Sequence, residues 1–202
     1  MTIEEMITAV QRELGIQVDG RAGPETWGAI YRRLIKPAAA TAPATPAIDA
    51  VDARSETHIA TLLPEVQPLA RALVQKAAQH EIRIRVISGT RSYAEQDALY
   101  AQGRTAPGIK VTNARGGHSN HNFGIAFDVG VFEGNQYLGE SVKYKAVGAL
   151  GMELGLEWGG NWKTIVDQPL FQLRPAWAAG LSARDLLAEL RARTTAGRQL
   201  LA

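Results

Sequence analysis

The chain has 202 residues, of which 46% are hydrophobic, and its formal net charge is +2 at pH 7. This hydrophobic fraction is enough for a buried core and excludes an intrinsically disordered protein. The basic residues are spread along the sequence, which argues against a nucleic-acid-binding protein. Cysteine is absent, so there is no disulfide framework, and any metal would have to be held by His, Asp or Glu.

The first residues, Met-Thr-Ile-Glu-Glu-Met, lack the basic start and the apolar run of a secretory signal peptide. No apolar stretch reaches the roughly 20 residues that a membrane-spanning helix needs. We therefore expect a soluble protein that is made in the cytoplasm without a signal peptide and does not insert into a membrane. Nothing in the sequence points to more than a monomer.

Residues 1–36 predict a small helical module. Apolar residues recur at helical spacing over residues 3–14, and Gly15 suits the end of that helix. A Gly-Pro turn signal at 23–24 then precedes a second short helix that runs to Leu34. The Ala/Pro/Thr-rich stretch 37–52 predicts a semi-extended linker, which leaves residues 53–202 as the main domain.

The main domain shows helical periodicity and two-residue alternation in turn. Its segments predict an α+β fold, in which a small antiparallel sheet is flanked by helices. Helices are expected at 64–80, 94–102, 142–154 and, after the N-cap residue Ser182, at 182–193; strands are expected at 82–87, 123–131 and near 170–173; residues 103–120 are expected to form a loop.

His121 and Asp128 are separated by a Phe-Gly-Ile-Ala-Phe step that indicates a buried turn leading into a strand. Imidazole nitrogen and carboxylate oxygen are zinc ligands, and a catalytic zinc usually takes three protein ligands. A single histidine is more often an ordinary surface or core residue than a ligand. A carboxylate in an apolar strand is more informative, because an unpaired buried charge is very costly. The sequence therefore predicts that Asp128 is paired or binds a metal.

Four motifs follow one another in the main domain: Ser-Gly-Thr-Arg91-Ser, Ser-x-His121-x-x-Gly-x-Ala-x-Asp128, Glu157-Trp-Gly-Gly-x-Trp and Asp167-x-Pro-x-Phe-Gln. Their order and spacing, from about residue 71 to 173, resemble the zinc peptidases of the D-alanyl-D-alanine carboxypeptidase and L-alanyl-D-glutamate endopeptidase family. These are wall-cutting enzymes common among bacterial and phage lysins. The resemblance implies an α+β zinc peptidase domain, zinc as cofactor and bacterial cell-wall peptidoglycan as partner.

The resemblance also implies roles for single residues. His121 and Asp128 match the first two zinc ligands, and Asp167 matches the acidic residue that acts as general base. Arg91 matches the arginine that holds the scissile carbonyl or its developing negative charge. Three further residues are candidates for substrate contact, although an exposed loop position explains the last of them better: Gln96, Ser119 and His118.

The sequence departs from the family pattern at Leu170. The family reads Asp-x-Pro-His-Phe, with the histidine as third zinc ligand, whereas this chain reads Asp-Gln-Pro-Leu170-Phe. Leucine cannot ligate a metal, and even loss of a ligand's supporting partner weakens binding about 10–100-fold. Three interpretations stay open: an engineered inactive variant of an active peptidase, a pseudoenzyme that binds wall peptides without cutting, or a site completed by His118 or water. The first is favoured because the other four site residues are retained: Arg91, His121, Asp128 and Asp167.

The N-terminal segment resembles part of a peptidoglycan-binding-type module. The matching residues are Gln11, Leu14, Gly15, Val18 to Gly20, Gly23, Pro24, Thr26 and Trp27. The whole chain therefore predicts a peptidoglycan hydrolase of endolysin type that acts on the cell wall after release from the cytoplasm. The Tyr-x-x-Gln-x-x-Leu-Tyr and Trp-Gly-Gly-x-Trp patterns favour cleavage of the L-alanyl-D-glutamate amide. A D-alanyl-D-alanine carboxypeptidase and a non-catalytic wall-binding pseudoenzyme are the alternatives.

Overall fold

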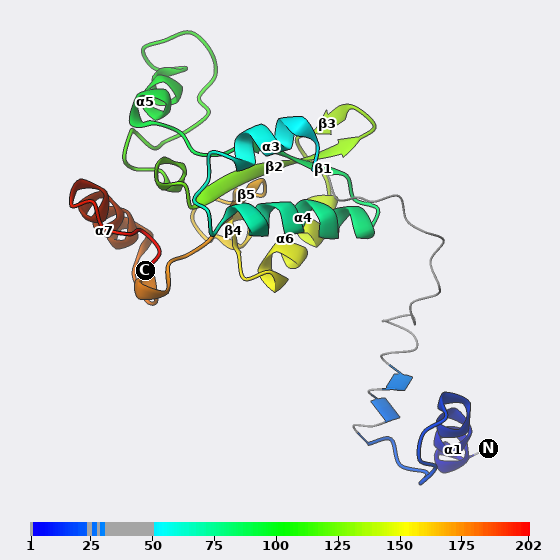
Figure 1. The fold of residues 1–202 in the computed structure, drawn as a ribbon. Coiled ribbons are helices and arrows are strands. Elements are labelled where there is room, and N and C mark those ends of the chain that lie inside the picture. The colour runs from blue at the N-terminus through cyan, green and yellow to red at the C-terminus, as the bar shows by residue number, and fades with distance from the viewer. Residues whose placement is uncertain (1, 24–25, 28, 31–50) are drawn as a thin grey trace. The chain divides into compact units, whose positions relative to one another are not determined.

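The structure is a computed structural model that describes residues 2–23, 26–27, 29–30 and 51–202. The chain divides into two units, Met1–Ala47 and Ile48–Ala202, which are described separately below (Figure 1). Much of the expected second helix of the N-terminal module and residues 37–50 of the expected linker lie outside the described residues.

The first unit is organised around the buried side chain of Gln11 on helix α1 (Ile3–Leu14). The helix starts with a capping box at Thr2 and ends at Gly15, which has the left-handed φ of 66° that glycine tolerates. The Gln11 amide nitrogen donates to Asp19 Oδ1 at 2.7 Å and to Thr26 Oγ1 at 3.0 Å, while its oxygen accepts from two backbone N–H groups of the same turn. Gln11 thus holds the turn that follows the helix.

The second unit contains an antiparallel sheet in the order β1-β2-β5-β4, and a short strand β3 also pairs with β2. The long strand β2 is central, because three strands pair with it. Strand β1 pairs with its middle, β5 with its first residues and β3 with its last residues. The strands are β1 (Ile84–Ser88), β2 (Ala126–Glu133), β3 (Gln136–Leu138), β4 (Glu157–Trp158) and β5 (Leu170–Gln172).

Five α-helices accompany this sheet in the second unit, which confirms the predicted α+β class. They are α3 (Ala53–Ile59), α4 (Gln67–Gln79), α5 (Tyr93–Ala101), α6 (Lys143–Glu153) and α7 (Ala183–Thr195), with short 3-10 turns at Asn120–Phe123, Gly159–Asn161 and Ala176–Ala178. Helix α3 and strands β3 and β4 were not predicted from the sequence. Within the described parts of the chain, no helix combines the length and apolar character needed to cross a membrane.

The expected strand 123–131 begins later than its sequence pattern suggests. Residues Asn120–Phe123 form a 3-10 turn, and Gly124 follows with a φ of 69°, so β2 starts only at Ala126. A β-carbon at residue 124 would also come within 3.2 Å of Leu63. Glycine is therefore required here both by the backbone angle and by the close approach of the neighbouring chain.

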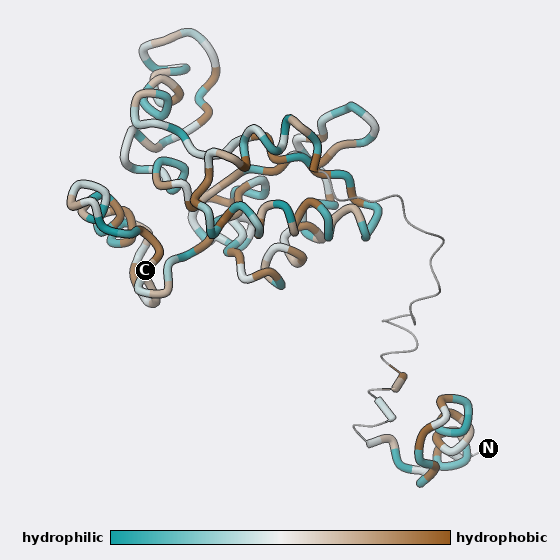
Figure 2. The backbone as a smooth tube through the Cα atoms, in the orientation of Figure 1, coloured by the Kyte–Doolittle hydropathy of each residue, from teal (hydrophilic) through white to brown (hydrophobic). Residues whose placement is uncertain are grey.

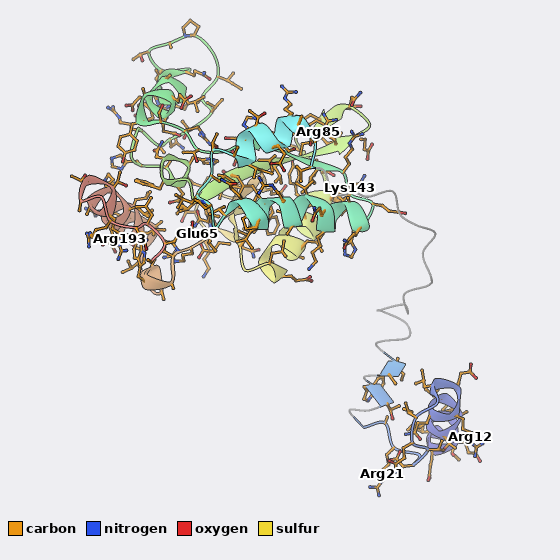
Figure 3. The ribbon with its side chains drawn as sticks, viewed as in Figure 1. Arg12, Arg21, Glu65, Arg85, Lys143 and Arg193 are labelled. Atoms are coloured by element: carbon orange, nitrogen blue, oxygen red, sulfur yellow. The ribbon has the colours of Figure 1, made fainter. Side chains whose placement is uncertain are left out.

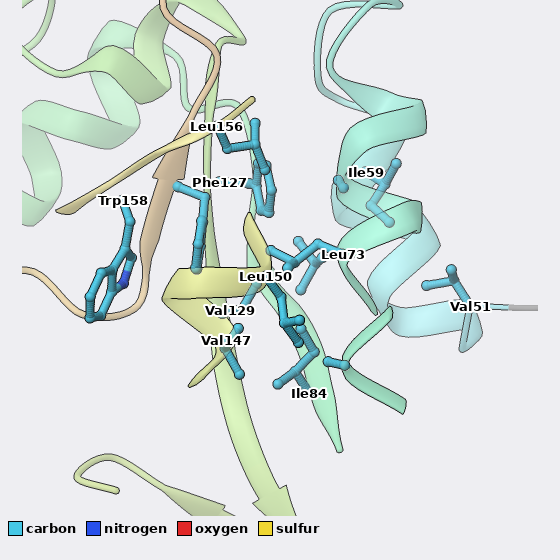
Figure 4. Packing of buried hydrophobic residues seen from close by; sticks show 14 of the residues in the cluster. Val51, Ile59, Leu73, Ile84, Phe127, Val129, Val147, Leu150, Leu156 and Trp158 are labelled. Carbon is cyan, nitrogen blue, oxygen red and sulfur yellow. The ribbon is translucent and has the colours of Figure 1, made fainter. Parts of the chain in front are cut away.

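One face of the sheet forms the main core. Side chains alternate along β2, so Phe127 and Val129 point toward the helices α4 and α6, where they meet Leu73 and Val147 (Figure 4). Hydrophobic residues are concentrated where these helices face the sheet (Figure 2). Phe127 also stacks on Phe171 of β5, with ring centroids 5.9 Å apart. The alternate residues of β2, which include Asp128, therefore lie on the opposite face.

A second cluster attaches helix α7 to the segment that enters β2. Phe123 and Ile125 pack there against Leu186 and Leu190, all of them buried. The polar residue His121 lies just before this anchored segment. Burial of four large apolar side chains therefore fixes the backbone that carries the histidine.

Replacing Ser92 by alanine is expected to destabilise the main unit by about 1 kcal/mol, because Ser92 caps helix α5. Its hydroxyl accepts from the Glu95 backbone N–H at 3.2 Å, and the Glu95 carboxylate accepts from the Ser92 N–H at 2.7 Å. Urea denaturation checks the change. Ser92→Thr, which keeps the hydroxyl, is the matched control, and an alanine variant as stable as the threonine variant would contradict the capping role.

Candidate active site

Four polar residues with predicted roles meet around Asp128, on the face of the sheet opposite the main core. Asp128 comes from β2, His121 from the 3-10 turn before it, Arg91 from the loop after β1, and Asp167 from the loop before β5. Close contacts or charge interactions connect the other three to Asp128. The structure thus brings together residues that are up to 76 positions apart in the sequence.

His121 is held by one ring nitrogen and leaves the other without a hydrogen-bond partner. Its side chain is only 2% exposed, and Nδ1 lies 2.8 Å from the carbonyl oxygen of Gly89. In the tautomer that donates Nδ1–H to this carbonyl, the lone pair of Nε2 is free. Nε2 is buried without a hydrogen-bond partner and lies 3.3 Å from Asp128 Oδ1. Histidines that bind metals are oriented in the same way, by a hydrogen bond from the second nitrogen.

Gly89 allows the backbone to approach closely at this point. A β-carbon at position 89 would lie 2.3 Å from the His58 carbonyl oxygen and 2.4 Å from Thr61 Oγ1. The loop that carries the Gly89 carbonyl therefore lies directly against the end of helix α3. This contact sets the position of the carbonyl that orients His121.

Replacing Gly89 by alanine is accordingly expected to destabilise the main unit by about 1–3 kcal/mol through overpacking. It should also shift the ring of His121, because the loop must move away from His58 to make room. Urea denaturation gives the first effect, and the NMR chemical shifts of the His121 ring give the second. Gly139→Ala is the control, since its backbone φ is not in the left-handed region and a β-carbon there would meet only Tyr137, at an ordinary contact distance of 3.6 Å. Equal stability of the two variants would show that the close approach is unimportant.

Asp128 is a carboxylate held between two cationic or potentially cationic groups. Its side chain is 19% exposed, with Oδ2 3.3 Å from the Arg91 guanidinium and Oδ1 3.3 Å from His121 Nε2. A β-bulge at residue 87 turns Ser88 toward the same face, where its hydroxyl bonds to Asp128. Burial alone would raise the pKa of Asp128, but His121, Arg91 and Ser88 together outweigh it and lower that pKa. Asp128 is therefore kept as an anion, as the sequence predicted for a buried carboxylate.

Arg91 is fixed by a buried amide. Its guanidinium donates to Gln96 Oε1 at 3.0 Å, and the Gln96 amide donates in turn to the Ala114 carbonyl at 2.9 Å. Gln96 is fully buried, a placement that suits positioning of Arg91. Of the other two predicted substrate contacts, Ser119 is partly exposed beside the histidine turn, and His118 is an exposed loop residue.

Asp167 lies within electrostatic reach of the same group. Burial, followed by the charge of Asp128, raises the pKa of Asp167, while His121 and Arg91 oppose the rise. Its backbone N–H donates to the Gly159 carbonyl at 3.0 Å, which ties the loop to the Trp-Gly-Gly motif. A carboxylate with a raised pKa binds a proton more readily and so suits general-base chemistry.

Leu170 lies beside the two potential metal ligands. It is the direct cross-strand partner of Asp128 and only 7% exposed. Directly opposed residues of antiparallel strands share a face and have β-carbons about 4.5–5.5 Å apart. The side chain at position 170 is therefore next to the Asp128 carboxylate, at the position expected for a third metal ligand.

The residues present fit a metal ion at two positions and not at the third. The unpartnered Nε2 of His121 and the carboxylate of Asp128 are suitable donors. The neighbouring Leu170 offers no donor atom. In the described part of the chain, no group of three or more His, Cys, Asp or Glu residues is placed to hold a metal. The three-ligand zinc site implied by the resemblance is therefore not formed by these residues.

A chain of polar side chains behind the site was not found from the sequence. Asn120 donates to Gln172 Oε1, and Gln172 donates to Glu157 Oε2 at 2.6 Å. Glu157 also lies 3.5 Å from Arg174. The only signal in the sequence was a glutamine in an otherwise apolar strand, two residues after Leu170. This chain connects β4 and β5 to the residue that precedes His121.

Fold and site together define a class: an α+β protein in which a histidine–aspartate pair, an arginine and a second carboxylate form one cluster, an arrangement whose groups can support hydrolysis. Comparison with known proteins agrees with this class. The VanY family of D-alanyl-D-alanine carboxypeptidases matches residues 60–157. The peptidoglycan L-alanyl-D-glutamate endopeptidase CwlK of Bacillus subtilis is 40% identical over 126 residues, which cover 56% of this chain and 74% of that protein.

Among solved structures, the L-Ala D-Glu endopeptidase ChiX of Serratia marcescens is 27% identical, with a TM-score of 0.47, covering 60% of this chain and 87% of that one. On the match to CwlK, the chain belongs to the family of peptidoglycan peptidases that contains L-alanyl-D-glutamate endopeptidases and VanY-type carboxypeptidases.

Proposed function

We propose that this protein acts on the stem peptide of peptidoglycan at the amide between L-alanine and D-glutamate. The observation that carries the proposal is that His121, Arg91 and Asp167 gather around Asp128 on one face of the sheet. The choice of this amide as the cleaved bond follows the relative CwlK, which is a peptidoglycan L-alanyl-D-glutamate endopeptidase. In this proposal the chain consists of an N-terminal module (1–36), a linker (37–52) and a peptidase domain (53–202). It acts as a monomer and reaches the wall after release from the cytoplasm.

The residues of this chain can perform separate parts of an amide hydrolysis. The Arg91 guanidinium, held by Gln96, can bind the scissile carbonyl oxygen and stabilise the negative charge that develops on it. Asp167 can take a proton from an attacking water and later return it to the leaving nitrogen. His121 and Asp128 would hold zinc, which the family resemblance implies, but Leu170 leaves its coordination incomplete. Cleavage by the chain with Leu170 is therefore expected to be slow or absent.

Leu170 also supports a second candidate function, a wall-binding protein that does not cut. In that case the retained Arg91 and Asp167 would bind the stem peptide, and the N-terminal module would add a contact with the wall. The two candidates share the ligand and differ in turnover. The two functions are distinguished by replacing Leu170 with histidine, because only a disabled peptidase would then gain activity.

The bond itself can be identified with a defined substrate. A disaccharide-pentapeptide is incubated with zinc and the Leu170→His variant, and the products are weighed by mass spectrometry. Release of a peptide that starts with D-glutamate supports the endopeptidase assignment. Release of a single D-alanine supports the VanY-type carboxypeptidase, which the family description favours. If neither product forms after zinc loading, both enzymatic assignments are wrong.

A further inference from the structure

The loop that follows α5, residues 103–117, is held against the end of that helix by Arg104. The loop arches beside α5 and carries side chains along its length (Figures 1 and 3). The Arg104 guanidinium donates to the Thr112 carbonyl at 3.0 Å and to Asn113 Oδ1 at 2.9 Å. It also donates to the Tyr100 carbonyl at 2.6 Å and stacks on the Tyr100 ring at 3.9 Å. Arg104 therefore ties the returning part of the loop to the helix.

The part of the loop that Arg104 holds also contacts the buried side chain of Gln96. The Gln96 amide nitrogen donates to the Ala114 carbonyl at 2.9 Å and to Thr112 Oγ1 at 3.3 Å. Thr112 Oγ1 also accepts from the Ala114 backbone N–H at 3.1 Å, which fixes the two acceptors relative to each other. A side-chain amide has two donor hydrogens on its nitrogen and an acceptor oxygen. The loop therefore binds the nitrogen end of the Gln96 amide and leaves the oxygen end for another partner.

That partner is Arg91. Its Nη1 donates to Gln96 Oε1 at 3.0 Å, while its Nη2 lies 3.3 Å from Asp128 Oδ2. A guanidinium has only donors, so a Gln96 amide turned by half a rotation would set its NH2 group against Arg91 and lose the bond. Both Nη groups are thus held, and the loop fixes the direction of the amide. An unbroken series of contacts connects Arg104, through Thr112 and Gln96, to the active-site arginine.

We propose that Arg104 is a positioning residue for Arg91. Among the described residues, Arg104 forms no hydrogen bond or ion pair with the four residues of the candidate site, so it acts through the loop and Gln96. The role rests on the proposed function, because Arg91 can stabilise the developing charge only when its guanidinium points at the scissile carbonyl. The orientation of the guanidinium itself does not depend on that function.

The first test follows the Arg91 guanidinium by NMR in the full chain with Leu170. A guanidinium held at both Nη groups gives two Nη signals, and the rate of exchange between them reports its rotation. The Arg91 signals are identified as those that disappear in Arg91→Lys. We expect exchange to be at least about tenfold faster in Gln96→Met and in Arg104→Met than in the parent, because each variant removes hydrogen bonds that restrain the rotation.

Arg115→Met is the matched control for this test. Arg115 lies over the same Tyr100 ring, at 4.7 Å, but among the described residues its side chain bonds to neither Thr112 nor Gln96. Its exchange rate should equal that of the parent. Should Arg104→Met fail to fold, Thr112→Val decides, since it removes the hydroxyl that Gln96 contacts and keeps the carbonyl that Arg104 contacts. An unchanged rate in the variant that decides, or equal acceleration in Arg115→Met, would overturn the positioning role.

Turnover gives the second test, in the Leu170→His background with zinc. We expect Arg104→Met to lower kcat about tenfold to a hundredfold, somewhat less than the 10²–10³ that loss of a whole donor to the developing charge costs. KM should change much less, and Arg115→Met should match its parent. A KM that rises as much as kcat falls would contradict a positioning role. An inactive Leu170→His parent would count against the proposed function, while the exchange rates would still decide how Arg91 is held.

Discussion

Replacing Leu170 by histidine is expected to tighten zinc binding by at least about a hundredfold, because the change adds a missing donor and loss of even a supporting partner costs 10–100-fold. The position is favourable, since residue 170 is the direct cross-strand partner of Asp128, whose carboxylate lies 3.3 Å from His121 Nε2. Competition with a fluorescent zinc chelator measures the affinity. The melting temperature of the variant should rise with zinc, because an ion that binds only the folded state stabilises it.

Leu170→Gln is the matched control for this prediction. It places a polar side chain of similar length in the same buried position, but it lacks the imidazole that completes a histidine-rich zinc site. We expect both variants to be less stable than the parent without zinc, and only the histidine variant to recover with zinc. A histidine variant whose zinc affinity stays within a few-fold of the parent would contradict the assignment of the third ligand position.

Replacing Asp167 by asparagine in the Leu170→His background is expected to lower kcat by about 10²–10⁴, the usual contribution of a general base. Asparagine has nearly the same shape, so the backbone bond from residue 167 to Gly159 and the affinity for the peptide should be kept. Rates are measured on a defined muropeptide with zinc in excess. KM should change much less than kcat, since the carboxylate acts on the proton and not on binding.

Glu140→Gln provides the comparison for the loss of one negative charge, because Glu140 is exposed on the same unit. Its rate should equal that of the Leu170→His parent. Should the asparagine variant retain more than about a tenth of the parent rate, Asp167 is not the base. The polar chain through Glu157 would then be the next candidate to examine.

The longer helices were predictable because their hydrophobic spacing is set by their own contacts with the core. Helices α4, α6 and α7 lie within a few residues of the predicted segments. Strands β3 and β4 contain three and two residues, too few for a two-residue alternation to show. The turn at Asn120–Phe123 was missed because its 3-10 form depends on Gly124 and on the packing of Phe123 against α7.

For the candidate site, the sequence indicated the residue types and the gap at Leu170, but not the contacts. That Leu170 faces Asp128 follows from strand register, which depends on pairing between segments about 40 positions apart. The link from Arg91 to Gln96 likewise appears only when α5 packs beside the loop after β1.

The role of Leu170 is tested most directly by comparing the parent chain with its Leu170→His variant on purified peptidoglycan in the presence of zinc, with mass spectrometry of the released fragments. We expect that only the variant releases fragments, and that their masses correspond to cleavage between L-alanine and D-glutamate. Fragments released equally fast by the parent chain would contradict it, because a complete site would then exist without a donor at position 170.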